Sequence, residues 1–148
     1  MPLDQDANYL IVDDDGVCRA VMAAMLSSYG QCHFATDGQQ AVAAVSKALD
    51  HGCPYDLICL DLVMPGFSGH DTLSAIRQIE SQHGIYGSDG AKVIMTTSLY
   101  DSKHCIQSFR EGCESYLTKP IRQTELLDML RRLELIGVAA GDCPASGR

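Results

Sequence analysis

The chain has 148 residues, of which 46% are hydrophobic and 20% are charged, a composition that indicates one globular domain with its own core. The formal net charge of −8 argues against non-specific binding to nucleic acid or to an anionic membrane surface. The seven cysteines are scattered without a C-x-x-C pair, which argues against a structural zinc site and indicates reduced thiols in the cytoplasm.

Five short apolar runs are expected to form strands. The segment before the first run is acidic, and no run approaches transmembrane length, so we expect neither a signal peptide nor membrane insertion. Several runs are continuous rather than alternating, which is typical of strands buried on both faces. The runs are NYLIV (8–12), CHFAT (32–36), DLICL (56–60), KVIMT (92–96) and SYLT (115–118).

Segments with helical spacing of apolar residues follow each run. Asp37, Ser68 and Asp101 are helix start signals before the second, third and fourth of them. The last segment is expected to end near Ile136. The apolar positions are Val17, Val21, Met22, Met25 and Leu26, then Ala41, Val42, Val45 and Leu49, then Leu73, Ile76 and Ile79, then Ile106 and Phe109, and finally Leu126, Leu127, Leu130 and Leu133.

The order is therefore strand then helix, repeated five times. Such alternation predicts an α/β domain in which helices cover both faces of a five-stranded parallel sheet, linked by right-handed crossovers. We expect the domain to span residues 8–136, after an amino-terminal extension over 1–7. Residues 137–148 have no usable periodicity and are predicted to form a flexible tail.

Chemically active side chains follow the predicted strands. Asp13 and Asp14 follow the first, Asp61 the third, Thr97 the fourth and Lys119 the fifth. Ligands of open parallel sheets bind beyond the carboxyl ends of the strands, so these residues are expected to converge at one edge. Clustered carboxylates suit Mg²⁺ or Mn²⁺, and a carboxylate flanked by a cation and an ammonium can be a nucleophile toward phosphorus.

Each of these signals has an ordinary structural explanation when taken alone. An acidic residue after a strand, such as Asp15, is more often a turn or helix-capping residue, and a lysine before a proline is more often a solvated side chain. A lone threonine after a strand is usually structural. It is their joint occurrence at the ends of four strands that favours a site.

With these residues at the strand ends, the sequence resembles the receiver domains of two-component response regulators, the CheY-like family. The resemblance covers about residues 8–136 and implies a doubly wound, flavodoxin-like sheet in the order 2-1-3-4-5. The motifs that carry the resemblance are LIVDDD (10–15), DLICLDLVMPGFSG (56–69), VIMTTS (93–98) and YLTKPI (116–121).

The resemblance also implies roles for individual residues. Asp61 is the phosphoacceptor and, with Asp14 and the main-chain carbonyl of Val63, a ligand of Mg²⁺, while Asp13 acts mostly through a metal-bound water. Lys119 pairs with Asp61 and then with the phosphoryl group. The remaining implied roles belong to Thr97 and Tyr116 as the switch pair, to Lys119–Pro120 as a cis peptide, and to Val63 and Leu99 as modulators of phosphoryl lifetime.

The implied reaction is transfer of a phosphoryl group to Asp61 from a phosphohistidine on a sensor histidine kinase or a histidine phosphotransfer protein. The output is a changed binding face, formed by the fourth helix, fifth strand and fifth helix, for a downstream protein. Only about a dozen residues follow the last helix, so a single-domain regulator without direct nucleic-acid binding is expected. Arg19 is expected to be a solvated residue of the first helix, where kinases and phosphotransfer domains dock in this family.

Two other functions are weighed against this interpretation. A phosphatase with an aspartyl nucleophile requires a second aspartate two residues further on as general acid, and Val63 stands there. A receiver that binds partners without phosphorylation is disfavoured because the chemically active positions are all present. We therefore expect a switch that assists only its own phosphorylation and dephosphorylation, rather than an enzyme. Because Val63 and Leu99 are apolar and cannot orient a water molecule, we expect slow dephosphorylation.

Overall fold

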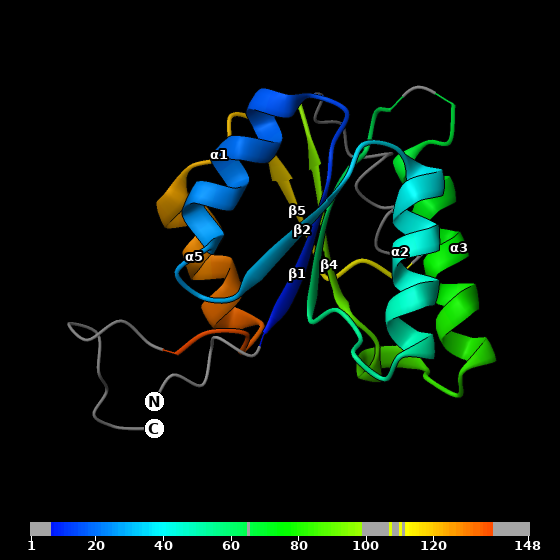
Figure 1. The fold of residues 1–148 in the computed structure, drawn as a ribbon. Coiled ribbons are helices and arrows are strands. Elements are labelled where there is room, and N and C mark those ends of the chain that lie inside the picture. Colours follow the sequence, from blue (N-terminus) through cyan, green and yellow to red (C-terminus); the bar gives the residue numbers. More distant parts are fainter. Residues whose placement is uncertain (1–6, 65, 99–106, 108–109, 111, 138–148) are drawn as a thin grey trace.

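The computed structural model describes residues 7–64, 66–98, 107, 110 and 112–137. Within them, five parallel strands form one sheet in the order β2-β1-β3-β4-β5, which confirms the predicted fold class (Figure 1). Of the expected fourth helix only residues 107 and 110 are described; its apolar positions Ile106 and Phe109 lie outside the described residues, as do 1–6 and 138–148. The strands are β1 (Asn8–Val12), β2 (Gln31–Ala35), β3 (Leu57–Asp61), β4 (Lys92–Thr97) and β5 (Ser115–Thr118).

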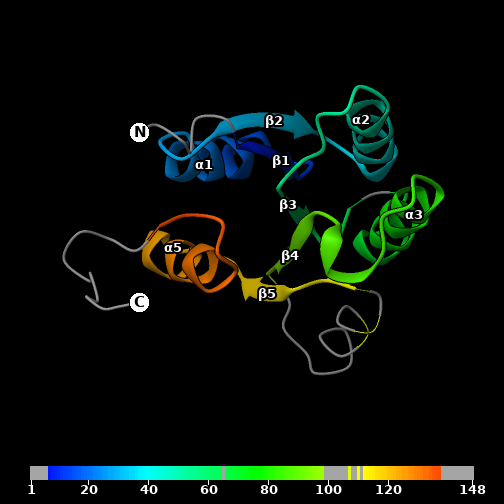
Figure 2. The same cartoon turned by 90° about the horizontal axis from the view of Figure 1, so that it is seen from below.

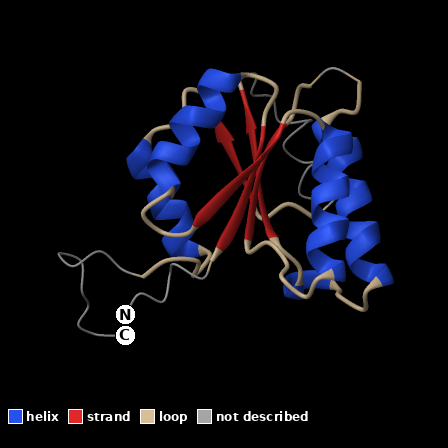
Figure 3. Cartoon of the chain, in the orientation of Figure 1, coloured by secondary structure: helices blue, strands red, loops and turns tan. Residues whose placement is uncertain are grey.

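Helices cover both faces of this sheet. The α-helices of the described residues are α1 (Gly16–Leu26), α2 (Gly38–Asp50), α3 (Gly69–Gln82) and α5 (Gln123–Arg132), and a 3₁₀ turn, η2 (Gly87–Asp89), precedes β4. Figures 1 and 2 show α1 and α5 on one face and α2 and α3 on the other. Figure 3 shows the resulting three layers, with the strands between two helical layers. No helix among the described residues is long and apolar enough to cross a membrane.

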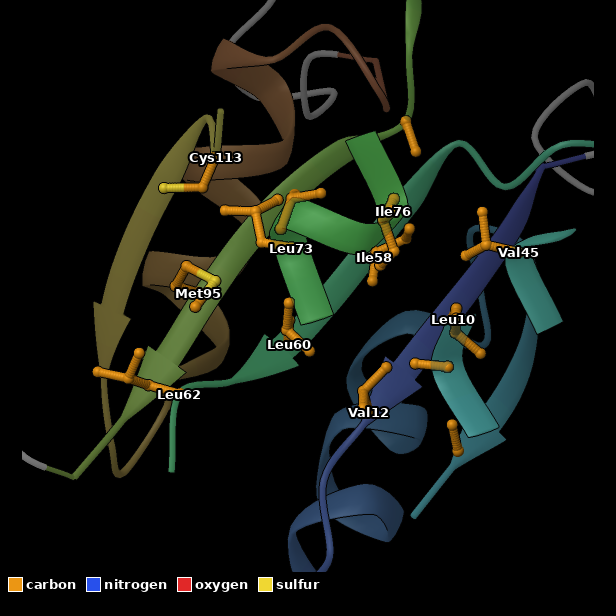
Figure 4. Close-up of a cluster of buried hydrophobic side chains, with 14 of the residues drawn as sticks. Leu10, Val12, Val45, Ile58, Leu60, Leu62, Leu73, Ile76, Met95 and Cys113 are labelled. Carbon is orange, nitrogen blue, oxygen red and sulfur yellow. The ribbon is translucent and has the colours of Figure 1, made fainter. Parts of the chain in front are cut away.

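The central strands bury side chains on both faces, which explains their continuous apolar sequences. In β1, Leu10 and Val12 pack with α2 and α3, whereas Tyr9 and Ile11 pack with α1 and α5. Figure 4 shows the first of these two cores, where Leu10, Ile58 and Met95 come from three different strands. Two cores on opposite faces fix the sheet, and therefore fix the edge at which the strands end.

Polar side chains cap three of the helices. The side chain of Asp37 accepts a hydrogen bond from the N–H of Gln40 at the start of α2, and Ser68 does the same for Asp71 at the start of α3. Both caps were predicted. Asp15 caps α1 by accepting from the N–H of Val17, which agrees with the ordinary structural interpretation of this residue.

Two details of the helices differ from the predictions. Val17 and Val21, expected to face the core, are 71% and 44% exposed, because the buried side of α1 is formed by Met22 and Leu26. Helix α5 ends at Arg132 rather than near Ile136, and Glu134 adopts a positive φ of 62° just beyond it. Ile136 is nevertheless buried in the core on the α1 and α5 face.

Candidate functional site

The candidate site lies at the carboxyl edge of the sheet, where the central strands give way to loops. Asp13 follows β1, Asp61 is the last residue of β3, and Lys119 follows β5. Backbone hydrogen bonds continue the strand pattern to this edge: the N–H of Asp13 donates to Ala35, and that of Lys119 donates to Thr97. The parallel sheet therefore brings these three side chains together at its carboxyl edge.

Three carboxylates meet at this edge. Asp13, Asp14 and Asp61 each offer an oxygen, and these oxygens lie within 4.8 Å of one another. Asp13 and Asp61 are buried and Asp14 is exposed. Oxygens on opposite sides of an octahedral Mg²⁺ stand about 4.2 Å apart, twice the usual Mg–O distance, so hard ligands at this spacing suit that ion. The residues present thus fit a Mg²⁺ site.

Lys119 neutralises part of this negative charge. Its Nζ lies 2.7 Å from Oδ2 of Asp13 and 3.6 Å from Oδ2 of Asp61, and the Lys119–Pro120 peptide bond is cis. Burial lowers the pKa of the ammonium, but the hydrogen bond to Asp13 and the charges of both carboxylates outweigh that effect and leave the pKa raised. Lys119 is therefore a fixed positive charge at the site.

Lys119 makes the ion pair with Asp61 that the resemblance implied, and it makes a closer one with Asp13. The ammonium makes its hydrogen bond to Asp13, and Asp61 is the more distant carboxylate. Asp13 has one oxygen engaged by the N–H of Asp15, which leaves Oδ2 for the lysine. Motif spacing brings residues to one edge of the sheet but does not determine which of two neighbouring carboxylates an ammonium prefers.

Asp61 has the most perturbed acidity of the site. Burial raises the pKa of its carboxyl group to about 6, Lys119 opposes this rise, and the charge of Asp13 adds to it. One further contact, from the N–H of Val63 to Oδ1 at 3.3 Å, favours the charged form. The carboxylate is thus held in a poorly solvated position beside other acids, where a cation is strongly favoured.

The other predicted site residues lie around this centre. Thr97 ends β4 and is fully buried, and Tyr116 is half-buried on β5 against the core of the α2 and α3 face. Val63 is 57% exposed beyond β3. Leu99 lies outside the described residues. The switch role of Thr97 and Tyr116, and the carbonyl of Val63 as a ligand, remain predictions.

Sequence reasoning missed two features beside the acidic cluster. Arg19 is not simply solvated, because its Nη1 donates to the main-chain carbonyl oxygen of Asp13 at 2.7 Å. A mostly apolar cavity of about 150 Å³ also opens next to Lys119. The apolar residues Val17 and Val21 of α1 could have indicated this cavity. Helical periodicity, however, does not separate apolar residues that face a core from those that face solvent. The cavity is lined by Asp13, Val17, Cys18, Val21, Met22, Thr96, Lys119, Pro120 and Ile121.

Comparison with known proteins identifies the family of this chain. The family model for the response regulator receiver domain matches residues 9–131, and the chain belongs to that family. A curated relative, the regulatory protein VanRB of Enterococcus faecalis, is 28% identical over 124 residues, which are 84% of this chain and 50% of the relative. The chain thus spans about half the length of this relative.

Solved structures of the same fold are also similar. The receiver domain of Saccharomyces cerevisiae Ssk1, crystallised with the histidine phosphotransfer protein Ypd1, is 26% identical, with a TM-score of 0.74 over 86% of this chain and 88% of that one. The CheX–CheY–BeF₃⁻–Mg²⁺ complex from Borrelia burgdorferi contains a chain that is 25% identical, with a TM-score of 0.73 over 86% of this chain and 89% of that one. The present chain is therefore a receiver domain of the two-component type.

Proposed function

We propose that this receiver domain accepts a phosphoryl group on Asp61 from a phosphohistidine of a sensor histidine kinase or a histidine phosphotransfer protein. The observation that carries the proposal is the position of Asp61, a buried carboxylate 3.6 Å from a lysine ammonium and clustered with two further acids. A carboxylate oxygen of Asp61 attacks phosphorus, the phosphorus–nitrogen bond to the donor imidazole breaks, and an acyl phosphate forms.

The side chains of the site would position the reactants and balance charge. Asp13, Asp14 and Asp61, with the carbonyl of Val63, would hold Mg²⁺. The bound ion would stabilise negative charge on the phosphoryl oxygens. Lys119 would supply a second positive charge, and its bond to Asp13 keeps the ammonium near Asp61 beforehand. Because the donor is already activated, positioning and electrostatics account for most of what this chain would contribute.

Phosphorylation would then change a binding surface. The new dianionic group would draw in the hydroxyl of Thr97, and Tyr116 would move with it, so that the face around β5 and α5 binds a downstream protein differently. The backbone bond from the N–H of Lys119 to Thr97 supports this coupling, because it joins the two phosphoryl-binding positions directly. We propose that output passes through a protein partner rather than through nucleic acid.

Helix α1 is proposed to dock the phosphohistidine donor. Val17 and Val21 are large apolar side chains exposed on this helix, and they line the cavity beside Lys119. Exposed apolar residues next to a reactive group favour a protein partner over a small solute. The related Ssk1 receiver, in its complex with a phosphotransfer protein, is a precedent for a partner of this class.

The domain is proposed to act as a switch and not as a turnover enzyme. The position two residues after Asp61 holds Val63, which cannot serve as the general acid that an aspartyl phosphatase needs. Steady turnover of small phosphomonoesters with Mg²⁺ would contradict this part of the proposal.

The proposal is tested with a small phosphodonor. Incubation with Mg²⁺ and acetyl phosphate, followed by intact-mass measurement, should show one added phosphoryl group in the natural chain and none in Asp61→Asn. Asp89→Asn, which alters an exposed aspartate of η2, is the matched control and should be labelled normally. Equal labelling of the Asp61→Asn variant, or no labelling of the natural chain, would overturn the assignment of Asp61.

A further inference from the structure

Arg19 is bound to the backbone of the acidic loop rather than to one of its carboxylates. Its Nη1 donates to the carbonyl oxygen of Asp13, six positions earlier in the sequence, at 2.7 Å. Among the described residues, the ion pairs of this cluster are made by Lys119 with Asp13 and Asp61, and none by Arg19. The guanidinium therefore acts on the peptide group that joins Asp13 to Asp14.

That peptide group belongs to the backbone from which the side chain of Asp14 projects. Asp13 is held by its own side-chain contacts, to the N–H of Asp15 and to Lys119. By contrast, the part of the chain that the structure describes gives the exposed carboxylate of Asp14 no hydrogen bond. The position of this carboxylate thus depends on the backbone between the end of β1 and the start of α1.

Arg19 connects the backbone of the loop after β1 to helix α1. Its own N–H bonds to the carbonyl of Asp15 in the first turn of α1, while its side chain reaches back over Gly16. A Cβ at Gly16 would lie 3.3 Å from Nη2 of Arg19, so the guanidinium passes close to this glycine. A hydrogen bond from a charged donor to a carbonyl is stronger than a neutral one, and this bond closes a loop of only a few residues.

We propose that Arg19 is a positioning residue for Mg²⁺: by holding the carbonyl of Asp13, it keeps the carboxylate of Asp14 turned toward Asp61. This inference rests on the proposed use of Mg²⁺ and goes beyond the assigned acids and lysine. Arg19 touches neither the ion nor the phosphoryl group. Its loss would weaken binding of the ion without removing any group that takes part in the reaction.

The test is the Mg²⁺ affinity of Arg19→Met, which keeps the length of the side chain but removes the donor. Calorimetric titration with MgCl₂ should show a dissociation constant raised about ten-fold, the size of effect typical when a residue that orients a metal ligand is removed. Arg19→Lys, which retains one donor for the same carbonyl, should recover most of the affinity. Arg132→Met removes the same charge from an exposed position of α5 and should bind as the natural chain does.

A second measurement separates positioning from a role in folding. With acetyl phosphate, Arg19→Met should need more Mg²⁺ for half-maximal phosphorylation, yet reach the rate of the natural chain when Mg²⁺ saturates. Urea unfolding of each variant identifies conditions in which all are fully folded, so that affinity is compared between folded proteins. An unchanged dissociation constant in Arg19→Met, or an equal loss in Arg132→Met, would overturn the inference.

The outcome for Arg19 is independent of the outcome for Asp61. If the natural chain binds Mg²⁺ but is not labelled by acetyl phosphate, the proposed phosphorylation fails while the calorimetric comparison still decides the role of Arg19. If labelling occurs and the Arg19 variants bind Mg²⁺ equally well, the function stands and the positioning role is rejected.

Discussion

At the scale of single residues, Asp61 illustrates how a site can be built at a cost to stability. Asp61 is 5% exposed and its carboxyl group lies beside two other acids, and burial raises the pKa of that group to about 6 from an ordinary value of 3.8. A folded protein in which a carboxyl pKa is raised binds its proton more tightly than the unfolded chain does. The free energy of unfolding of this protein therefore falls as the pH rises from about 4 to about 6, and the contribution of Asp61 to stability is fully lost above about pH 6.

Asp61→Asn should consequently stabilise the protein at neutral pH in the presence of EDTA. The gain in unfolding free energy over the natural chain should be small near pH 4 and grow to about 2–3 kcal/mol at pH 7.5. Urea unfolding across this pH range measures it. Asp89→Asn, at an exposed position, should show no such pH-dependent gain, and a constant difference for Asp61→Asn would contradict the explanation.

Val63 is the residue at which phosphoryl lifetime can be tested. Its apolar side chain is 57% exposed two residues beyond Asp61, where it cannot orient an attacking water. Val63→Asn should speed dephosphorylation by about ten-fold, equivalent to about 1.4 kcal/mol in activation free energy. Loss of the phosphorylated mass over time, after removal of the phosphodonor, gives the rate. Val63→Leu keeps the apolar character and should decay as the natural chain does; equal rates for Asn and Leu would rule out the water-orienting explanation.

At the scale of elements, Arg77 joins α3 to the amino ends of β4 and β5. Its guanidinium contacts Oε1 of Glu80 at 2.8 Å and Oε1 of Glu114 at 3.1 Å. It also donates to the carbonyl oxygens of Ala91 at 2.8 Å and of Gly112 at 3.1 Å. Glu80 is buried, so this arginine is its neutralising partner as well as a link between three elements.

Arg77→Met should therefore be strongly destabilising. It leaves the carboxylate of Glu80 buried without its cation, and breaking a buried pair in this way costs about 3–5 kcal/mol. Chemical denaturation measures the loss. In Arg131→Met the same substitution breaks an ion pair with Asp128, whose side chain is 63% exposed, and should cost less than about 1 kcal/mol. Similar losses in the two variants would mean that the Arg77 contacts contribute no more than a surface pair.

The elements themselves were largely predictable from local sequence. The apolar runs predict all five strands to within one residue at each end, because the central strands β1, β3 and β4 bury side chains on both faces and are therefore mostly apolar. Asp37 and Ser68 marked helix starts because their side chains satisfy backbone N–H groups that the helix leaves free. The prediction of which side of α1 faces the core was wrong, because the exposed residues Val17 and Val21 have the same helical spacing as buried residues.

At the scale of the whole molecule, the site depends on topology. Asp13 and Lys119 are 106 residues apart in sequence, yet their side chains lie 2.7 Å apart. Parallel strands with their carboxyl ends at one edge bring such residues together, which is why sequence alone indicated the acids, the lysine and the threonine as one group. The contact of Arg19 with a main-chain carbonyl could not be predicted. Every residue has a backbone carbonyl, so the sequence does not show which one accepts a hydrogen bond from a given side chain.

The proposed phosphorylation of Asp61 and the proposed docking of the donor on α1 use different groups, and Val21→Glu tests whether they can be separated. Val21 is 44% exposed on α1, so a charge there should cost little stability but should disrupt an apolar contact with a donor protein. We expect transfer from a phosphorylated histidine phosphotransfer domain to slow by at least about ten-fold, equivalent to about 1.4 kcal/mol. Labelling by acetyl phosphate should stay unchanged, because no reacting group is altered.

Tyr86→Glu is the matched control for this prediction. Tyr86 is 67% exposed but precedes η2 and β4, at the opposite edge of the sheet from Asp61. It should leave transfer from the donor protein at the rate of the natural chain. If Val21→Glu and Tyr86→Glu transfer equally fast, the donor does not dock on α1; if Val21→Glu also loses labelling by acetyl phosphate, the substitution has damaged the acidic site itself.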